Sequence, residues 1–317
     1  MQPETPFAAP ESGVKTLPAS GTAIGREHQP VIAGGEEGAA QPWDVPRYEV
    51  HELAPRAARY ALCVFVINEG ARLLSQLEKM HPWLNDVDLI VADGGSTDGS
   101  TEPNRLAQLG VRTLLIKTQA GKLGSQMRMA FAYCLSQGYA GVIVMDGNDK
   151  DSPVAIPRFI GGLEIGLDHV QGSRFVRGGR AINTPAARYL GVRLLHAPLI
   201  SLAARYRYTD TTNGFRAYSR RLLLDPRIAL FRPCFTSYEL HYYLAIQAAR
   251  LGFRISEIPV TRAYPAQGPT PSKIHGWRGN VSILRTVWNV CRGQYRPTQE
   301  EIERAQVGVD RLELGGD

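Results

Sequence analysis

Two short apolar stretches of the sequence each run into an aspartate-rich turn. Residues 88–93 are followed by Gly-Gly-Ser-Thr-Asp, and residues 142–146 are followed by Gly-Asn-Asp-Lys-Asp. In open α/β sheets, ligands bind beyond the carboxyl ends of the strands. Carboxylates at those ends can accept hydrogen bonds from ribose or base donors, or hold a divalent ion against a diphosphate. Two such turns in one chain therefore predict a nucleotide-diphosphate site and favour an enzyme that acts on an activated substrate.

The elements that must position these turns alternate between strand and helix patterns. Apolar runs of strand length are expected as strands at 59–67, 87–92, 111–117, 141–145, 168–172 and 254–261. Apolar residues at helical spacing predict helices at 71–81, 100–109, 122–137, 153–165, 186–206, 237–250 and 277–291. The alternation implies an α/β fold with a mainly parallel, doubly wound sheet flanked by helices.

Composition divides the chain into three regions. Residues 1–57 are rich in Pro, Gly, Ala and Glu without apolar periodicity, and we expect a flexible tail there. Residues 58–296 are expected to form one domain, with a nucleotide-sugar half at 58–152 and an acceptor half at 153–296. Residues 297–317 are expected to be an acidic tail.

Charge is unevenly distributed along the chain. The 317 residues carry a formal charge of +6, but residues 171–297 hold 20 Lys and Arg against 4 Asp and Glu, a difference of +16. Such a region favours an anionic partner such as a phosphate or a lipid headgroup, or else is a solvated basic face. Nucleic-acid binding is not expected, because the basic residues are not interleaved with a recognisable DNA or RNA module.

The four cysteines are widely spaced and form no metal-binding pattern. Reduced, buried thiols in a cytoplasmic protein are the expected account. We see neither a signal peptide nor an apolar run of the roughly 20 residues that a spanning helix needs. The protein is therefore expected to be cytoplasmic, with at most peripheral contact to the membrane. Its oligomeric state is not predicted.

Six motifs occur in the order typical of a known family. They are Val64-Phe-Val-Ile-Asn-Glu69, Val91-Ala-Asp-Gly-Gly-Ser-Thr-Asp-Gly99, Gly121-Lys122, Met145-Asp-Gly-Asn148, Gly172-Ser-Arg-Phe175 and Asp210-Thr-Thr-Asn-Gly-Phe-Arg216, with Ser272-Lys273 beyond them. The chain resembles the family 2 glycosyltransferases over about residues 60–290, and especially the branch of dolichyl-phosphate mannose synthases and other polyprenyl-phosphate glycosyltransferases. The resemblance implies a Rossmann-like GT-A fold and inverting transfer of a sugar from a nucleoside-diphosphate sugar.

Donor binding is expected at the ends of the first strands. Carboxylates at Glu69 and Asp93 can accept bonds from ribose or base donors, and glycines allow close backbone approach. Lys122 begins a helix and is a plausible diphosphate contact, or else a solvated lysine. The donor residues expected with these motifs are Ile67, Asn68, Glu69, Asp93, Gly95, Lys122, Asp146, Gly147 and Asn148.

Asp146 and Asn148 occupy the place of the metal-binding motif of the resembled family. Mg²⁺ or Mn²⁺ there would bridge the donor diphosphate. The sequence departs from the family pattern, because Asn148 replaces an acid and Lys150 stands where relatives carry a polar ligand. Either the ion binds weakly through Asp146 and Asn148, or the Lys150 ammonium itself supplies positive charge and reduces the need for metal.

Acceptor binding is expected in the basic half. In the resembled lipid-phosphate transferases, arginines at the places of Arg174 and Arg188 hold the acceptor phosphate, and Lys273 is a further candidate contact. Arginine suits this task because its planar fork can bond phosphate oxygens in pairs. The segment 189–208 has apolar residues at helical spacing with arginines around them, which fits either a membrane-surface helix or a core-facing one.

The mechanism depends on the acceptor. A phosphate monoester is already mostly dianionic, since its second pKa is about 6, so the enzyme needs positioning and electrostatic stabilisation by groups such as Asp146 and Arg174. A hydroxyl acceptor needs a base, for which Asp210 is the candidate. Absence of another obvious base favours a polyprenyl (dolichyl-type) phosphate. A soluble or glycan hydroxyl is the alternative, and a non-catalytic nucleotide-sugar-binding subunit is a third reading.

Overall fold

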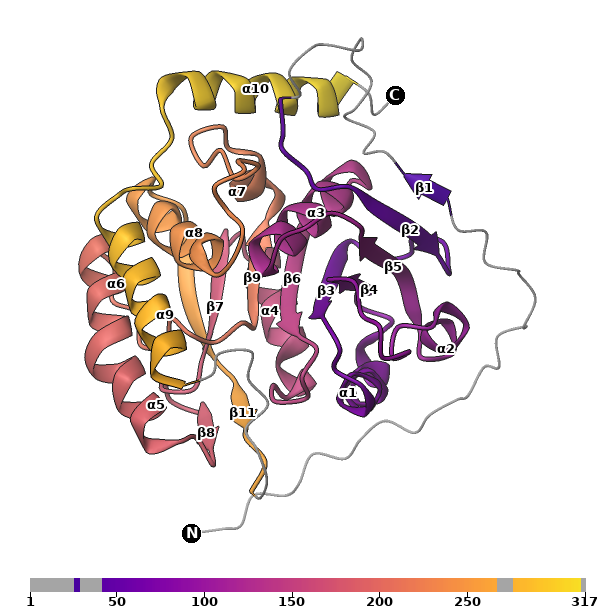
Figure 1. Ribbon diagram of the computed structural model, residues 1–317, viewed down its shortest axis with the longest axis horizontal. Coiled ribbons are helices and arrows are strands. Elements are labelled where there is room, and N and C mark those ends of the chain that lie inside the picture. The colour runs from indigo at the N-terminus through magenta and orange to yellow at the C-terminus, as the bar shows by residue number, and fades with distance from the viewer. Residues whose placement is uncertain (1–25, 29–41, 267–275, 315–317) are drawn as a thin grey trace.

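The computed structural model describes residues 26–28, 42–266 and 276–314 of the chain. Its centre is a nine-stranded sheet with the order β1-β2-β5-β4-β3-β6-β9-β7-β10 (Figure 1). The strands of this sheet are β1 (Arg26–His28), β2 (Tyr48–Glu52), β3 (Tyr60–Val66), β4 (Asp88–Asp93), β5 (Val111–Lys117), β6 (Gly141–Asp146), β7 (His169–Ser173), β9 (Arg216–Ser219) and β10 (Ile255–Pro259). A second sheet pairs β8 (Arg180–Ile182) with β11 (Thr261–Ala263) in parallel.

Strand directions determine which edge of the sheet gathers the carboxyl ends of the strands. Strands β3, β4, β5 and β6 are parallel neighbours, and β7 pairs with β10 in parallel. Strand β9 runs antiparallel to both β6 and β7, so β7 and β10 point the same way as β6. The carboxyl ends of six strands therefore meet at one edge, and the expected mostly parallel α/β sheet is confirmed.

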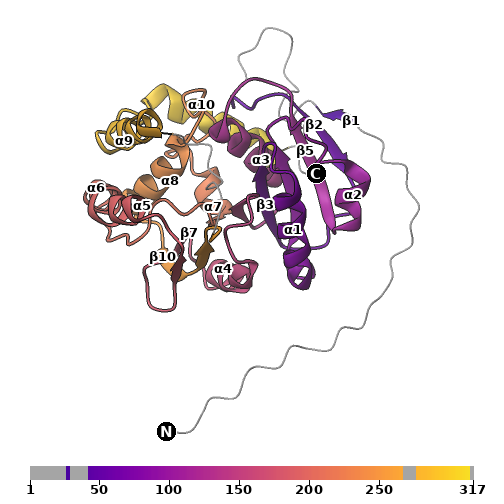
Figure 2. The ribbon, with the colours of Figure 1, turned by 60° about the horizontal axis from the view of Figure 1, so that its bottom comes forward.

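Helices cover both faces of this sheet (Figure 2). The longer elements are α1 (Ala71–Met80), α2 (Pro103–Gln108), α3 (Leu123–Ser136), α4 (Ile156–Glu164), α5 (Ala186–Gly191), α6 (Ala197–Ala204), α7 (Arg220–Leu224), α8 (Glu239–Arg250), α9 (Gly276–Cys291) and α10 (Gln299–Leu314). The short turns are η2 (His81–Trp83), η3 (Pro153–Ala155) and the π-helical η4 (Val192–His196), which joins α5 to α6. One apolar core contains α3 and α8, and the other contains α1 and α4.

Strand β3 separates the two cores. All seven of its residues are buried. Ala61, Cys63 and Phe65 contribute to the core with α3, whereas the alternate residues, including Leu62 and Val64, contribute to the core with α1. This is the period of two that a strand covered on both faces imposes on its side chains.

Secondary structure extends beyond both boundaries expected from the sequence. Strand β2 lies within the segment expected to be a flexible tail, and it pairs with β5. The buried Trp43 stacks on Phe231 with ring centroids 4.0 Å apart. At the other end, α10 lies against Trp43, whose indole N–H donates to the Ala305 carbonyl oxygen. One short strand and one tryptophan between prolines give too little apolar periodicity to be recognised.

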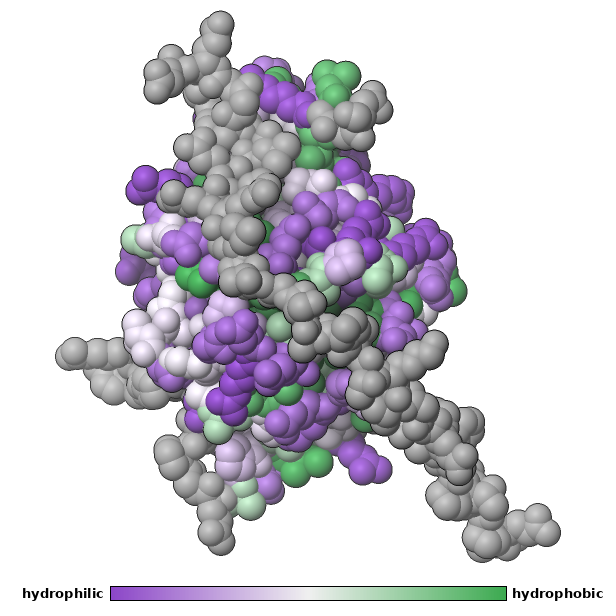
Figure 3. All heavy atoms as spheres, turned by 90° about the vertical axis from the view of Figure 1, so that its right-hand side faces the viewer, coloured by the Kyte–Doolittle hydropathy of each residue, from purple (hydrophilic) through white to green (hydrophobic). Residues whose placement is uncertain are grey.

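The cysteines match the expected burial only in part. Cys63 and Cys134 are buried with their sulfurs 3.5 Å apart, but Cys234 is exposed and Cys291 is half-buried. Within the described ranges, no helix has the length and apolar character needed to cross a bilayer. The side of the molecule that carries β1, β2 and α2 shows mainly hydrophilic residues where grey atoms do not cover it (Figure 3).

Candidate active site

The first half of the site consists of turns that follow β3 and β4. Asn68 has a φ of 49°, and its side-chain oxygen accepts a hydrogen bond from the Thr97 backbone N–H at 2.8 Å. Glu69 is nearly buried and accepts from the Arg72 guanidinium at 2.9 Å. Ile67 is 39% exposed beside these residues. The expected donor residues 67–69 therefore lie together, in a turn fixed by the turn after β4.

Asp93 is more tightly held than the sequence suggests. Its carboxylate accepts hydrogen bonds from the backbone N–H groups of Gly95 and Ser96 and from the Ser96 and Thr101 hydroxyls. Only 1% of the residue is exposed. Gly95 has a φ of +96°, a conformation that glycine adopts without strain. The geometry thus gives Asp93 a structural role, because its carboxylate holds the turn that follows β4.

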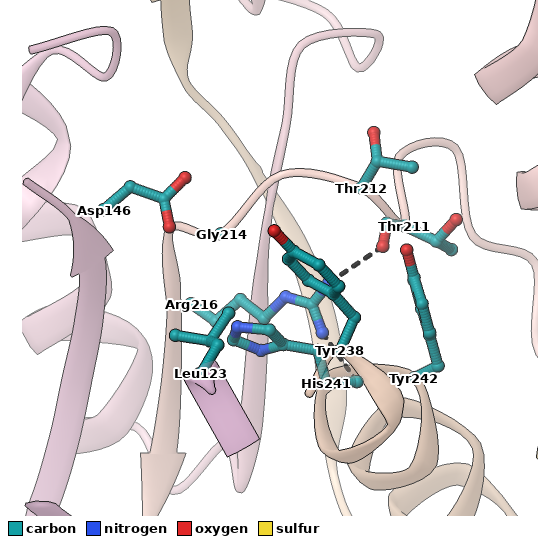
Figure 4. Close-up of a pocket in the computed structure, with 9 residues that line it drawn as sticks. All are labelled: Leu123, Asp146, Thr211, Thr212, Gly214, Arg216, Tyr238, His241 and Tyr242. Atoms are coloured by element: carbon teal, nitrogen blue, oxygen red, sulfur yellow. Dashed lines mark hydrogen bonds between the residues drawn. The ribbon is translucent and has the colours of Figure 1, made fainter. Parts of the chain in front are cut away.

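Asp146 stands at the end of β6 and opens into a small cavity (Figure 4). Gly214 faces its carboxylate so closely that an added Cβ would lie 2.9 Å from Oδ1. The remaining wall comes from α3, α8 and the loop before β9, and its residues are Leu123, Thr211, Thr212, Arg216, Tyr238, His241 and Tyr242. The cavity therefore joins β6 and α3 to elements of the second half of the chain.

His241 forms an uncharged part of that wall. Burial, reinforced by the charge of Arg216, holds the pKa of His241 far below its usual range. The Arg216 guanidinium donates to the His241 and Thr211 carbonyl oxygens at 2.7 and 2.8 Å (Figure 4). The His241 Nδ1 atom is buried and has no hydrogen-bond partner among the described residues.

Arg262 links Asp146 to a second carboxylate. The guanidinium donates to Asp146 Oδ2 at 3.1 Å through one nitrogen and to buried Asp151 through the other. Burial alone would raise the pKa of Asp146, but the charges of Arg262 and Lys150 outweigh it and hold this pKa below its ordinary value. Asp146 is therefore an ionised carboxylate at neutral pH.

Two cations, Lys150 and Arg188, lie over the ring of Tyr264, next to this pair. Lys150 Nζ lies 5.4 Å from the ring centroid, and the Arg188 guanidinium carbon lies 5.6 Å from it. Arg188 also donates to the Tyr264 hydroxyl at 2.9 Å. Burial, followed by the charge of Arg262, lowers the pKa of Lys150 to about 8. This cationic wall is suited to a multiply charged anion.

The guanidinium group of Arg174 is paired with Asp210 and is therefore not a free cation beside this wall. It donates to Asp210 through Nε at 2.7 Å and through Nη2 at 3.0 Å, and to the Thr212 hydroxyl at 2.9 Å. The two side chains of this ion pair are 1% and 0% exposed. Burial would raise the pKa of Asp210, but the hydrogen bonds and charge of Arg174 keep it below its ordinary value. Asp210 is thus a poor proton acceptor that anchors the loop before Gly214.

Comparison with known proteins now identifies the family. The family model described as Glycosyl transferase family 2 matches residues 62–225. The chain belongs to this family. Family 2 membership makes the protein a glycosyltransferase, as the sequence motifs predicted.

Two curated relatives and one solved structure add detail. The chain is 27% identical over 201 residues to the polyprenol monophosphomannose synthase of Mycolicibacterium smegmatis, covering 61% of this chain and 73% of that one. It is 29% identical over 196 residues to the undecaprenyl-phosphate mannosyltransferase of Micrococcus luteus, covering 61% and 79%. Glucosyl-3-phosphoglycerate synthase from Mycobacterium tuberculosis, solved with Mn²⁺, UDP-glucose and phosphoglyceric acid, superposes with a TM-score of 0.53 at 19% identity, covering 76% and 81%. This superposition supports the GT-A fold.

The oxygens of this glycosyltransferase fit a divalent ion only in a limited way. Asn148 Oδ1 is buried and has no hydrogen-bond partner among the described residues, and the Asp146 carboxylate is ionised. No group of three His, Cys, Asp or Glu side chains suited to a metal occurs in the described part of the chain. A divalent ion would therefore take its other ligands from the donor phosphates and water. The neighbouring Lys150 and Arg262 charges would oppose its binding by electrostatic repulsion.

Sequence reasoning missed several residues that the fold brings to the site. Arg262 and Tyr264 follow β10, and Tyr238 and His241 come from the start of α8. The sequence did offer one indication for Arg262, because this residue directly follows an expected strand and so lies at the carboxyl edge of the sheet. The α8 residues carry no such signal. Lys273, an expected phosphate contact, lies outside the described residues.

Proposed function

We propose that this glycosyltransferase moves a sugar, with inversion, from a nucleoside-diphosphate sugar to a polyprenyl phosphate. The observation that carries the proposal is the ion pair between Arg174 and Asp210. It removes the candidate base for a hydroxyl acceptor, while the wall around Tyr264 supplies positive charge for a phosphate acceptor. The names of both curated relatives, which contain polyprenol and undecaprenyl phosphate, point to the same acceptor class.

The donor would lie along the edge formed by β3, β4 and β6. Glu69 and the turn shaped by Asp93 would receive the nucleoside, and Lys122 would face the diphosphate from the start of α3. Asn148 would share a Mg²⁺ or Mn²⁺ ion with Asp146. When bound, this ion neutralises charge on the departing diphosphate.

The acceptor phosphate would lie against Arg188, with Lys273 as a further candidate contact. Arg262 would stand between the acceptor phosphate and Asp146. Arg174 would act indirectly, by fixing Asp210 and the loop that carries Gly214. We therefore assign Arg174 a positioning role in place of the phosphate contact that the sequence suggested.

The reaction needs no protein base under this proposal. An oxygen of the dianionic phosphate attacks the anomeric carbon, while the bond from that carbon to the donor diphosphate breaks on the opposite side. The nucleoside diphosphate leaves with the bonding electrons. Fixed positive charges can stabilise the negative charge that develops on the leaving group without reorganising as the bond breaks.

A direct test offers purified protein a panel of nucleoside-diphosphate sugars with a short-chain polyprenyl phosphate, with and without Mn²⁺ or Mg²⁺. Released nucleotide and glycolipid are measured together. The expected result is nucleotide release that depends on the lipid phosphate, with an acid-labile glycosyl phosphate as product. Asp146→Ala should abolish transfer while the fold is retained. An alkali-stable product on a hydroxyl acceptor would contradict the proposal, as would nucleotide binding without turnover of any donor.

A further inference from the structure

Apolar side chains project into solvent from the helical segment that begins at the rim of the site. Leu190, Leu194 and Leu202 are 53%, 72% and 80% exposed. Leu190 and Leu194 are four residues apart, a spacing that places side chains on neighbouring turns of one helical face. Leu202 lies about two turns further along, in α6. Leu195, beside them, is 40% exposed. A core-facing helix does not present leucines to water in this way.

Helix α9 adds to the same side of the molecule. It lies beside α5 and α6 in both ribbon views (Figures 1 and 2), and the Cys291 thiol contacts the Leu199 carbonyl oxygen at 3.7 Å. Val281 and Trp288 of α9 are 53% and 52% exposed. They are seven residues apart, and therefore lie on one face of the helix. We call the surface formed by the exposed residues of α5, η4, α6 and α9 the leucine–arginine face.

The two stretches of the chain that carry these side chains have charge of one sign only. No Asp or Glu occurs between residues 169 and 209, or between 258 and 299. Exposed arginines accompany the apolar residues on both helical segments, namely Arg193, Arg205, Arg207, Arg285 and Arg292. Leucine and tryptophan next to arginine is the composition of helices that lie in the plane of a membrane interface.

Two of the most exposed apolar residues elsewhere lack this setting. Ile165 is 66% exposed at the end of α4 and directly follows Glu164, and Leu314 is 80% exposed and directly follows Glu313. Isolated residues of that kind are normal on a protein surface. The combination of clustered leucines with uniformly positive charge is what separates the leucine–arginine face from them.

We propose that the leucine–arginine face rests on a bilayer that contains anionic lipids. The leucines and Trp288 would enter the boundary between headgroups and acyl chains, and the arginines would contact headgroup phosphates. Arg188 of α5 donates to the Tyr264 hydroxyl at the site, so the face begins where the acceptor phosphate is proposed to bind. The inference deepens the proposed function, on which it rests for the nature of the acceptor, because it names the surface from which a lipid acceptor reaches the site.

The test measures co-sedimentation of the full chain with vesicles of phosphatidylcholine alone or with one quarter phosphatidylglycerol. Wild-type protein should bind the anionic vesicles, and added salt should weaken the binding. The double variant Leu194→Glu/Leu202→Glu should bind at least about tenfold less, because it removes apolar contact and adds like charge to the interface. The matched control Ile165→Glu/Leu314→Glu makes the same change in charge at exposed sites away from the face, and should bind as wild type does.

Arginine variants separate the electrostatic part of the binding. Each arginine near an anionic surface is worth about fivefold in partitioning, so Arg205→Gln/Arg207→Gln should lower binding by about 25-fold at low salt. Circular dichroism of each variant establishes that the fold is intact. The leucine variant should transfer sugar to a short-chain acceptor in solution at the wild-type rate. A loss of vesicle binding with this activity retained separates the inference about the membrane from the proposed function.

Three results would overturn the inference. The first is wild-type protein that does not bind anionic vesicles. The second is a leucine variant that binds as well as the matched control. The third is a wild-type dimer in light scattering that the leucine variant converts to monomer, since the face would then join two copies of the chain. Vesicle binding without any transfer activity would refute the proposed function alone.

Discussion

Asp210→Asn is the substitution that best separates a structural from a catalytic role at this site. Arg174 and Asp210 are 1% and 0% exposed, so water cannot replace the lost carboxylate charge. Removing one partner of such a pair typically costs about 3–5 kcal/mol, because the other charge stays buried without compensation. We therefore expect the free energy of unfolding to fall by about that amount, although asparagine nearly preserves the side-chain volume.

Urea unfolding followed by the fluorescence of the four tryptophans measures this loss. The folded pKa of Asp210 lies below its ordinary value of 3.8. The stabilisation from its ionised form is thus complete above pH 3.8 and is lost as the pH falls through the folded pKa. The difference in the free energy of unfolding between wild type and variant should stay constant from neutral pH down to pH 3.8, and it should narrow below that pH.

The double variant Arg174→Met/Asp210→Asn is the control. It removes both charges, so it should recover much of the stability lost in the single variant. A single variant within about 1 kcal/mol of wild type would refute the reasoning about the ion pair. If that stable variant had also lost transfer to a hydroxyl acceptor, Asp210 would be the base after all.

Further predictions concern Asp146, its charged neighbour and the segment before β2. Gly214→Ala places a Cβ 2.9 Å from Asp146 Oδ1 and should lower kcat roughly 100-fold with little change in Tm. In the control Gly161→Ala, the added Cβ meets nothing within 4 Å, so kcat should be unchanged. Unchanged kcat in the first variant would mean that the carboxylate position is not critical. Lys150→Gln should lower the Mn²⁺ concentration for half-maximal activity by roughly tenfold, because it removes a positive charge beside the proposed ion. An unchanged Mn²⁺ titration of activity would show that Lys150 does not affect binding of the ion. Trp43→Ala should reduce the free energy of unfolding by about 3–5 kcal/mol through loss of the Phe231 stack, and a loss below about 1 kcal/mol would exclude this segment from the core.

The central strands and helices could be predicted because their signals are local. The strand expected at 59–67 is β3 at Tyr60–Val66, and the helix expected at 122–137 is α3 at Leu123–Ser136. Buried strands read as continuous apolar runs, and helices show their own spacing. The π-helical turn η4 was not predicted, because its widened hydrogen-bond pattern has no distinct spacing in the sequence.

The partners of the site residues could not be predicted in the same way. The motif that contains Arg174 suggested a free cation, yet Asp210, 36 residues further on, accepts hydrogen bonds from two of its three guanidinium nitrogens. Arg262 likewise reaches Asp146 across 116 residues. Motifs predict which residues gather at an edge of the sheet, but the tertiary fold decides which charges neutralise one another.

Strand β9 has a consequence for how the chain folds. Its four residues, Arg216–Ser219, are the only strand that joins β6 to β7 in the described part of the sheet. The chain must travel from β6 through β7 before β9 can insert between them, so this pairing closes late and over a long loop. A nascent chain that ends before β9 leaves the edges of both strands unpaired, a state open to intermolecular pairing. The two halves of the molecule thus depend on each other for folding, and cutting between them should yield aggregating fragments in place of two separate domains.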